Sequence, residues 1–134
     1  NCRCGKSGDE LILGIGTDMV EIDRIQSAIE KNPRFLQRVY TMQEIESCQR
    51  KSNCWQSFAA RFAAKEAVSK AFGTGIGQIG FTEIEIKNMA GGQPQVLLHG
   101  AAQALARERN VQCVHISLSH SKAYAIATAV LEGE

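Results

Sequence analysis

The feature that most constrains the fold is an uninterrupted helical segment in the middle of the chain. Residues 55–72 contain neither glycine nor proline and are rich in alanine, the residue with the highest intrinsic helix propensity. Gly73 follows directly, and glycine is the residue type that most often ends a helix. Because 134 residues suffice for a single hydrophobic core, we expect one domain, residues 11–134, built around this helix.

Shorter elements are expected on both sides of the long helix. Thr41 and Glu44 have the spacing of a capping box, which predicts a helix start. Polar and apolar residues alternate in two later segments, as in half-buried strands. The full expectation is a strand at 11–15, helices at 20–30 and 34–40, a helix from 41, the long helix, a hairpin of 82–87 and 95–99 around Gly91-Gly92, a helix at 100–109, and antiparallel strands at 112–119 and 124–131, the last of them central. This order predicts an α+β fold in which an antiparallel sheet packs on the long helix.

Composition excludes several classes of function. The formal net charge of +1 argues against a nucleic-acid binder, whose domain is normally distinctly basic. No apolar run approaches the roughly 20 residues that a membrane-spanning helix needs. Five cysteines, an odd number in a chain of ordinary size, favour a reduced, cytoplasmic compartment over a secreted disulfide scaffold. Residues 1–10 lack an apolar core of a signal peptide and are interpreted as a flexible N-terminal extension.

One face of the long helix carries the first candidate chemistry. Phe58, Phe62, Glu66 and Lys70 stand four residues apart and therefore form one row. The neighbouring row holds two further cations, Arg61 and Lys65, and a glycine-rich segment, residues 74–80, follows the helix. Cations beside such a loop can hold phosphates. The alternative is an ordinary surface helix in which Glu66 pairs with Lys70.

A second candidate is Asp18, which follows a Gly-Ile-Gly-Thr segment at the expected end of the first strand. Mg²⁺ in proteins is often held by one or two carboxylates together with water and substrate phosphates. Asp18 and Glu66 would be such a pair if the fold brings them together, which sequence spacing alone does not establish. Asp18 could equally cap the helix that follows it.

The third candidate is the Ser/His-rich segment 117–122 at a strand end. It lacks the G-x-S-x-G elbow of a serine nucleophile, and a turn of this composition is often only a turn. The loop 73–77 has neither the Lys-Ser/Thr pair of a P-loop nor a dinucleotide fingerprint, so it indicates no more than a phosphate contact.

Taken together, three segments resemble the motifs of one family. Residues 14–25 read GIGTDMVEIDRI, residues 61–75 read RFAAKEAVSKAFGTG, and residues 117–120 read SLSH. In this order they resemble the holo-acyl-carrier-protein synthases, the single-domain bacterial type of 4′-phosphopantetheinyl transferase. Residues 35–36 and 41–44 are similar to the family's intervening segment, and the resemblance spans residues 11–132.

The resemblance implies a reaction and a fold of the 4′-phosphopantetheinyl transferase type. Such enzymes move the 4′-phosphopantetheine arm of coenzyme A onto a serine of apo-acyl carrier protein, release 3′,5′-ADP and support fatty acid biosynthesis. The resemblance further implies a homotrimer with active sites at subunit interfaces and Mg²⁺ as the metal ion, a place that Mn²⁺ could also take. Two departures stand out: residues 1–10 have no family counterpart, and Gln93 precedes Pro94 where the family often has a basic residue.

The resemblance also assigns roles to residues. It implies Asp18 and Glu66 as metal ligands and, with Lys70, as catalytic residues. It implies carrier-protein docking by Arg24, Arg34 and Arg38. The residues it implies for coenzyme A binding are Arg61, Lys65, Lys70, Gly73, Gly75, Pro94 and His120. Two other functions stay open from the residues themselves: a binding module that has lost catalysis, and a Mg²⁺-dependent phosphohydrolase that uses the same carboxylates.

Overall fold

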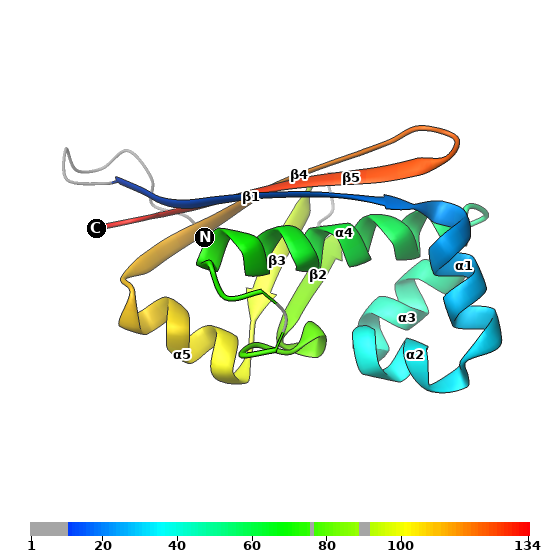
Figure 1. Ribbon diagram of the computed structural model, residues 1–134, viewed down its shortest axis with the longest axis horizontal. Helices are drawn as coiled ribbons and strands as arrows, with labels where there is room; N and C mark the ends of the chain where they lie inside the picture. The colour runs from blue at the N-terminus through cyan, green and yellow to red at the C-terminus, as the bar shows by residue number, and fades with distance from the viewer. Residues whose placement is uncertain (1–10, 76, 89–91) are drawn as a thin grey trace.

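The computed structural model describes residues 11–75, 77–88 and 92–134 (Figure 1). The expected flexible extension at 1–10 and Gly91 of the expected hairpin turn lie outside the described residues. The elements are β1 (Leu11–Glu21), α1 (Ile22–Lys31), α2 (Pro33–Val39), α3 (Met42–Gln49), α4 (Cys54–Phe72), a 3₁₀ turn (Phe81–Glu83), β2 (Ile84–Asn88), β3 (Pro94–Leu98), α5 (Gly100–Glu108), β4 (Val111–His120) and β5 (Tyr124–Gly133).

The α+β expectation is confirmed. Strands β1, β5 and β4 form an antiparallel sheet with β5 in the centre, and β2 and β3 form the expected hairpin. Helix α4 runs along one face of the three-stranded sheet, while α1, α2 and α3 gather at one end of the molecule (Figure 1). The inward-facing residues of β5 are alanines and one leucine, which lets α4 lie close to the sheet.

The first strand is longer than expected. The predicted strand at 11–15 ends too early, and the predicted helix at 20–30 begins two residues too early. The reason is that β1 pairs with β5 as far as Glu21, which lies opposite Tyr124. Pairing along the whole strand overrides the local helical spacing. Asp18 therefore lies inside β1, opposite Ala127, and the interpretation that it caps α1 is wrong: the N-cap position is Glu21.

Glycines place β1 against α4. A Cβ atom built on Gly16 would lie 2.0 Å from the carbonyl oxygen of Ala67, and one built on Gly14 would lie 2.0 Å from that of Ala71. Such distances are far inside van der Waals contact, so only glycine permits this approach. The two backbones consequently run antiparallel to each other, and Asp18 continues the row that faces the helix.

The expected helix ends are confirmed. Thr41 accepts a hydrogen bond from the backbone of Glu44, and the Glu44 carboxylate accepts one from the backbone of Thr41, as in a capping box. Gly73 adopts a left-handed conformation with φ 79° and ends α4. The strand expected from residue 82 begins two residues later, because the Glu83 carboxylate accepts hydrogen bonds from the backbones of Gly80 and Ala101 and holds the chain in a 3₁₀ turn.

Glu85 links folding stability to pH. Burial alone would raise its pKa, but hydrogen bonds from His99 and Thr41 and the charges of His99 and Lys65 outweigh burial and lower the pKa. The carboxylate thus contributes stability that is complete above the ordinary pKa of a glutamate and is lost as pH falls through the lowered value. We expect Glu85→Gln to lower the free energy of unfolding at pH 7 by about 1–3 kcal/mol.

Urea unfolding at a series of pH values from 7 to 3 measures this effect. The difference between wild type and Glu85→Gln should shrink as the pH falls below about 4.5. A difference that stays constant from pH 7 to pH 3 would contradict the assignment.

Candidate active site

Three charged side chains meet where β1 runs alongside α4. The Lys70 Nζ atom lies 3.0 Å from Asp18 Oδ1 and 3.1 Å from the carbonyl oxygen of Thr17, to which it donates hydrogen bonds. The Asp18 side chain is 15% exposed and that of Lys70 53%. The alternative of a simple Glu66–Lys70 surface pair is wrong, because Lys70 pairs instead with a carboxylate 52 residues away in the sequence.

Glu66 completes this group. Partial burial raises the pKa of its carboxyl group, the negative charge of Asp18 raises it further, and the positive charge of Lys70 opposes the rise. The two carboxylates therefore lie close enough to interact electrostatically. Sequence spacing alone could not establish this proximity. Across the described ranges, the Glu66 carboxylate has no hydrogen bond or ion pair of its own, so its oxygens are available to a ligand.

The donor set fits a hard divalent cation. Two carboxylates that repel each other, balanced by a single lysine, leave negative charge that a divalent ion would neutralise. Mg²⁺ prefers oxygen ligands and commonly uses one or two protein carboxylates. Asp18 and Glu66 are thus suited to the metal role expected of them.

The glycine-rich loop begins one turn beyond Lys70. Cβ atoms built on Gly73 or Gly75 would meet nothing within 4 Å, so this side of the loop is open to a ligand. The backbone N–H groups of both glycines already donate to carbonyl oxygens of Lys70 and Ser69 at the end of α4. They are therefore not free to cradle a phosphate, and the loop offers surface rather than hydrogen-bond donors.

Lys65 lies elsewhere than expected. Its side chain has no exposure, and its Nζ donates to Glu44 Oε1 at 2.8 Å, to Phe81 O at 2.9 Å and to Ile84 O at 2.6 Å. All three donors of the ammonium group are used within the core, so the expectation that it binds coenzyme A is not supported. Burial lowers the pKa of Lys65, and the neighbouring Glu44 carboxylate opposes this.

Arg61 is also buried. It is 3% exposed, and its guanidinium donates to the carbonyl oxygen of Ile86 at 3.3 Å, to the sulfur of Cys48 at 2.6 Å and to the hydroxyl of Ser47 at 3.3 Å. The row that carries Arg61 faces α3 and β2, whereas Glu66 faces β1. The expected cluster of three cations around Glu66 is therefore wrong, and Lys70 alone holds that place.

His120 lies in a different part of the molecule. It ends β4 and lines a groove of about 570 Å³ together with Ser119, Lys51 and Gln56. Asp18, Glu66 and Lys70 are not among the lining residues of this groove. Lys51 was missed by sequence reasoning, because a lone lysine after a fading helix carries no motif; only its position opposite His120 marks it.

Pro94 begins β3 and lines a second groove, of about 410 Å³, between β3 and β4. The structure thus separates the expected coenzyme A residues of one chain: Lys70 and the loop glycines lie at the end of α4, His120 in its groove, Pro94 between the strands, and Arg61 and Lys65 in the core. A single chain does not join them into one site.

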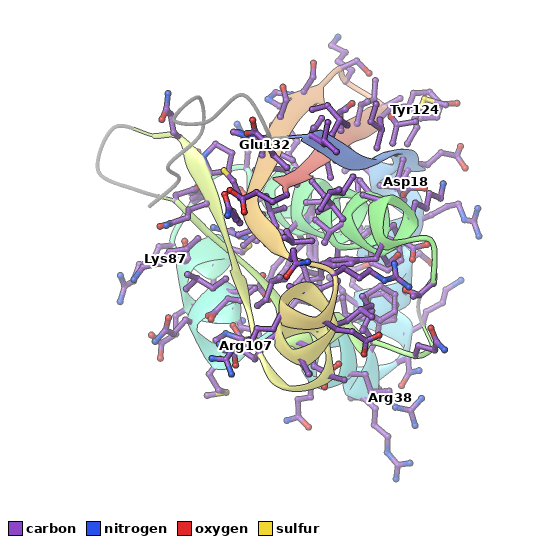
Figure 2. All side chains as sticks on the ribbon, turned by 90° about the vertical axis from the view of Figure 1, so that its left-hand side faces the viewer. Asp18, Arg38, Lys87, Arg107, Tyr124 and Glu132 are labelled. Carbon is purple, nitrogen blue, oxygen red and sulfur yellow. The ribbon has the colours of Figure 1, made fainter. Side chains whose placement is uncertain are left out.

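The three arginines expected to dock a carrier protein lie on adjoining helices. Arg24 is on α1, and Arg34 and Arg38 are on α2; all three are exposed. Figure 2 shows Arg38 projecting away from the body of the molecule. None of the three forms an ion pair with any residue that the structure describes.

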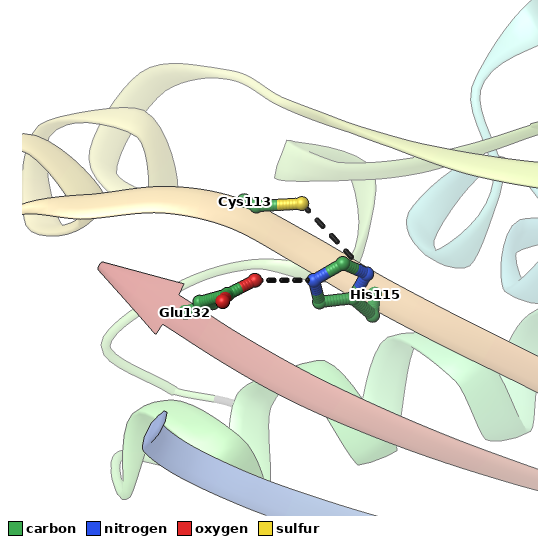
Figure 3. Close-up of side chains that lie close together, drawn as sticks. All are labelled: Cys113, His115 and Glu132. Atoms are coloured by element: carbon green, nitrogen blue, oxygen red, sulfur yellow. Dashed lines mark hydrogen bonds and ion pairs between the residues drawn. The ribbon is translucent and has the colours of Figure 1, made fainter. Parts of the chain in front are cut away.

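A further cluster lies on the outer face of the sheet (Figure 3). His115 Nε2 is 2.8 Å from Glu132 Oε1, and Cys113 Sγ is 3.8 Å from His115 Nδ1. The sulfur and the carboxylate approach opposite nitrogens of one imidazole ring, and one potential ligand atom from each residue lies within 4.8 Å of the others. Cys113 is also in a disulfide bond, so it offers no thiolate to a metal ion. The cysteine content of the chain had led us to expect reduced cysteines.

Comparisons with known proteins point to one family. The sequence model of the 4′-phosphopantetheinyl transferase superfamily matches residues 14–129. A holo-[acyl-carrier-protein] synthase of Ruminiclostridium cellulolyticum is 52% identical over 120 residues, which cover 87% of this chain and 90% of that protein. The protein of the same name from Moorella thermoacetica is 46% identical over 121 residues, which cover 90% and 94%.

Solved structures are similar throughout their length. The holo-ACP-synthase of Plasmodium yoelii aligns with a TM-score of 0.82 at 32% identity, covering 93% of this chain and 98% of the other. The synthase of Bacillus anthracis in complex with CoA (3′,5′-ADP) aligns with a TM-score of 0.76 at 38% identity, covering 92% and 98%. The Helicobacter pylori synthase in complex with coenzyme A gives 0.77 at 34%, covering 87% and 98%. In the part of this chain that the structure describes, no helix combines the length and apolarity that crossing a membrane requires.

Proposed function

The chain belongs to the 4′-phosphopantetheinyl transferase superfamily and acts as a holo-[acyl-carrier-protein] synthase, and we propose that Asp18, Glu66 and Lys70 carry its reaction. The enzyme moves the 4′-phosphopantetheine arm of coenzyme A onto a serine of apo-acyl carrier protein. One observation supports this assignment of residues. Asp18 of β1 meets Glu66 and Lys70 of α4, which lie 48 residues or more away in the sequence.

Each residue has a separate task in the transfer. A bond forms between the serine oxygen and the β-phosphorus of coenzyme A, and the bond from that phosphorus to the oxygen of 3′,5′-ADP breaks. Glu66 would accept the serine proton, because its carboxylate has no hydrogen bond of its own in the described structure. Lys70 stabilises the charge on the departing 3′,5′-ADP. Phosphoryl transfer depends mainly on such positioning and charge neutralisation.

A divalent ion is part of the proposal. Asp18 and Glu66 would hold Mg²⁺, or Mn²⁺ in its place. When bound, the ion supplies charge neutralisation at the diphosphate of coenzyme A. With the ion bound at Asp18, the ammonium group of Lys70, which is 53% exposed, could contact the leaving phosphate. Without the ion, Lys70 alone offsets the repulsion between the two carboxylates.

We also propose a homotrimer with shared active sites. The outer face of β1 and β5 is apolar and exposed: Ile15 is 66%, Met19 61% and Ile126 38% exposed, and Met19 lies directly opposite Ile126. An exposed apolar patch of this kind is typical of a protein–protein interface. The separation of the His120 groove from the Asp18–Glu66–Lys70 group supports the same arrangement, because two neighbouring chains could each supply one half of a site.

The apolar face gives a direct test of assembly. We expect Ile126→Glu to convert the trimer to monomers, because the glutamate would place a charge in the centre of the buried contact. Light scattering on the eluting protein measures the change. Met42→Glu is the control, since Met42 is 70% exposed on α3 and outside this face. A wild type that elutes as a monomer would contradict the trimer.

The exposed arginines of α1 and α2 are proposed to dock the carrier protein. Opposite charges across an interface steer association and raise its rate. We expect Arg38→Glu to raise the KM for apo-acyl carrier protein about tenfold while the KM for coenzyme A stays unchanged. Arg107→Glu, on the exposed side of α5, is the control and should leave both KM values unchanged (Figure 2). An equal effect of the two variants would remove the docking role.

In the groove of His120, we propose that the imidazole and the ammonium group of Lys51 bind the phosphate at the 3′ position of coenzyme A. Pro94 would contact the adenosine end, and the open sides of Gly73 and Gly75 would border the diphosphate. A cytoplasmic location completes the proposal, and cell fractionation tests it.

One experiment separates the three functions left open by the sequence. The protein is incubated with coenzyme A, Mg²⁺ and apo-acyl carrier protein, and the carrier and the coenzyme are then weighed by mass spectrometry. Transfer adds the mass of the phosphopantetheine arm to the carrier. A phosphohydrolase would consume coenzyme A and leave the carrier unchanged, and a binding module would change neither.

A further inference from the structure

We propose that Lys65 is a positioning residue, which fixes the rotation of α4 about its axis and thereby aims Glu66 at Asp18. This inference rests on the proposed function, in which Glu66 and Asp18 hold a divalent cation. Lys65 itself touches neither substrate nor metal, since its ammonium group is wholly buried on another side of the helix.

The contacts of Lys65 use all three N–H donors of its ammonium group. Its Nζ donates to the carboxylate of Glu44 and to the carbonyl oxygens of Phe81 and Ile84, at 2.6–2.9 Å. These partners come from α3, the 3₁₀ turn and β2. The Nζ atom also lies 5.8 Å from the ring centroid of Tyr40. An ammonium group with three hydrogen bonds to three separate elements cannot move without breaking at least one of them.

Glu44, the charged partner of Lys65, is itself immobilised. Its Oε1 accepts from the backbone N–H of Thr41 at 2.9 Å as well as from Lys65, and its Oε2 accepts from the backbone N–H of Ile86 at 2.7 Å. The carboxylate thus joins the start of α3 to β2, and it is 1% exposed. Lys65 is therefore tied to a fixed point of the fold and not to a movable surface chain.

Glu66 follows Lys65 directly on α4. Consecutive residues of an α-helix point about 100° apart, so the direction fixed at Lys65 determines the direction of Glu66. Within the residues that the structure describes, the Glu66 carboxylate has no hydrogen-bond partner of its own. Its orientation therefore depends on the rotation of α4. On the β1 side, the backbone of α4 closely approaches Gly14 and Gly16, and the half-exposed Lys70 side chain donates to Thr17 O and Asp18 Oδ1. Lys65 adds the fully buried restraint on another side of the helix.

The test compares three variants of the full chain. Lys65→Met removes the ammonium group and leaves the Glu44 charge buried, so it will destabilise the fold. The double variant Lys65→Met/Glu44→Gln removes both charges and recovers much of that stability. Val68→Ala is the matched control: Val68 is fully buried on the same helix, and its truncation lowers stability without touching the Lys65 contacts.

Three measurements are made on each folded variant: Mn²⁺ affinity by electron paramagnetic resonance, kcat and KM for coenzyme A, and thermal unfolding. Loss of a residue that orients a metal ligand typically costs about 10–100-fold in metal affinity or activity, and we expect this range for both Lys65 variants. The KM for coenzyme A should change less than about twofold, since no contact to the substrate is removed. Val68→Ala should keep wild-type Mn²⁺ affinity and kcat at equal or lower stability.

The outcomes are distinct. Wild-type Mn²⁺ affinity and kcat in the double variant would overturn the positioning role and leave Lys65 a purely structural residue. Loss of Mn²⁺ affinity in Val68→Ala to the same extent would overturn it as well. If neither Lys65 variant folds, Glu44→Gln alone, which keeps both carbonyl contacts, should show a smaller shift in the same direction, and no shift would count against the role. A wild type that binds Mn²⁺ but transfers nothing would instead refute the proposed function.

Discussion

Replacing Glu66 with glutamine is expected to lower the rate of phosphopantetheine transfer by at least about a thousandfold, because the variant loses a metal ligand and a proton acceptor that together contribute several kcal/mol to the transition state. The amide has nearly the same size as the carboxylate, and the Glu66 carboxylate has no hydrogen bond to lose in the described structure. The fold should therefore be retained, and the unfolding temperature should stay the same or rise, since the repulsion from Asp18 disappears.

The rate is measured by the mass shift of the carrier protein over time at saturating coenzyme A and Mg²⁺. Glu108→Gln provides the control, because it makes the same chemical change at an exposed position on α5, away from β1. This control should transfer at the wild-type rate. Near-normal transfer by the Glu66 variant would exclude the residue from the reaction.

The second large effect is expected on folding. In Gly16→Ala the added methyl group would lie 2.0 Å from the carbonyl oxygen of Ala67 and 2.7 Å from the backbone nitrogen of Ala71. Neither neighbour is a side chain that can turn aside, so β1 and α4 must separate. We expect the free energy of unfolding to fall by at least about 3 kcal/mol, at the upper end of the usual cost of overpacking.

Gly80→Ala makes the same change where there is room. The nearest atom to an added methyl group there is Glu83 Oε1 at 3.8 Å, and the backbone φ of −86° suits any residue. Urea unfolding of both variants measures the difference. Equal stability of the two alanine variants would show that the close approach of β1 and α4 does not hold the fold together.

Several elements could be predicted because their signals are local. The long helix α4, its glycine end, the capping box at Thr41 and the alternating strands all depend on neighbours in the sequence. The extent of β1 could not be predicted in this way. Residues 16–21 form a strand because they pair with β5, more than 100 residues later, and no local pattern shows that partner.

The residues of the candidate site could likewise be predicted only in part. The row at positions four apart on α4 correctly placed Glu66 and Lys70 on one face, but it could not show that Lys70 reaches across to Asp18. The same reasoning failed for Arg61 and Lys65, because helical spacing tells which residues share a face and not what that face contacts. Their partners, Ser47 and Glu44, lie on α3, and only the folded chain brings α3 against α4.

The central claim is that Asp18 and Glu66 share one divalent cation at the diphosphate of coenzyme A. A crystal structure of the protein grown with coenzyme A and Mg²⁺ tests it most directly. We predict a single ion with one carboxylate oxygen from each residue at about 2.0–2.1 Å, the distance usual for Mg²⁺, and diphosphate oxygens among its remaining ligands. An ion bound at the diphosphate by other residues, with Asp18 or Glu66 beyond its coordination distance, would contradict the account.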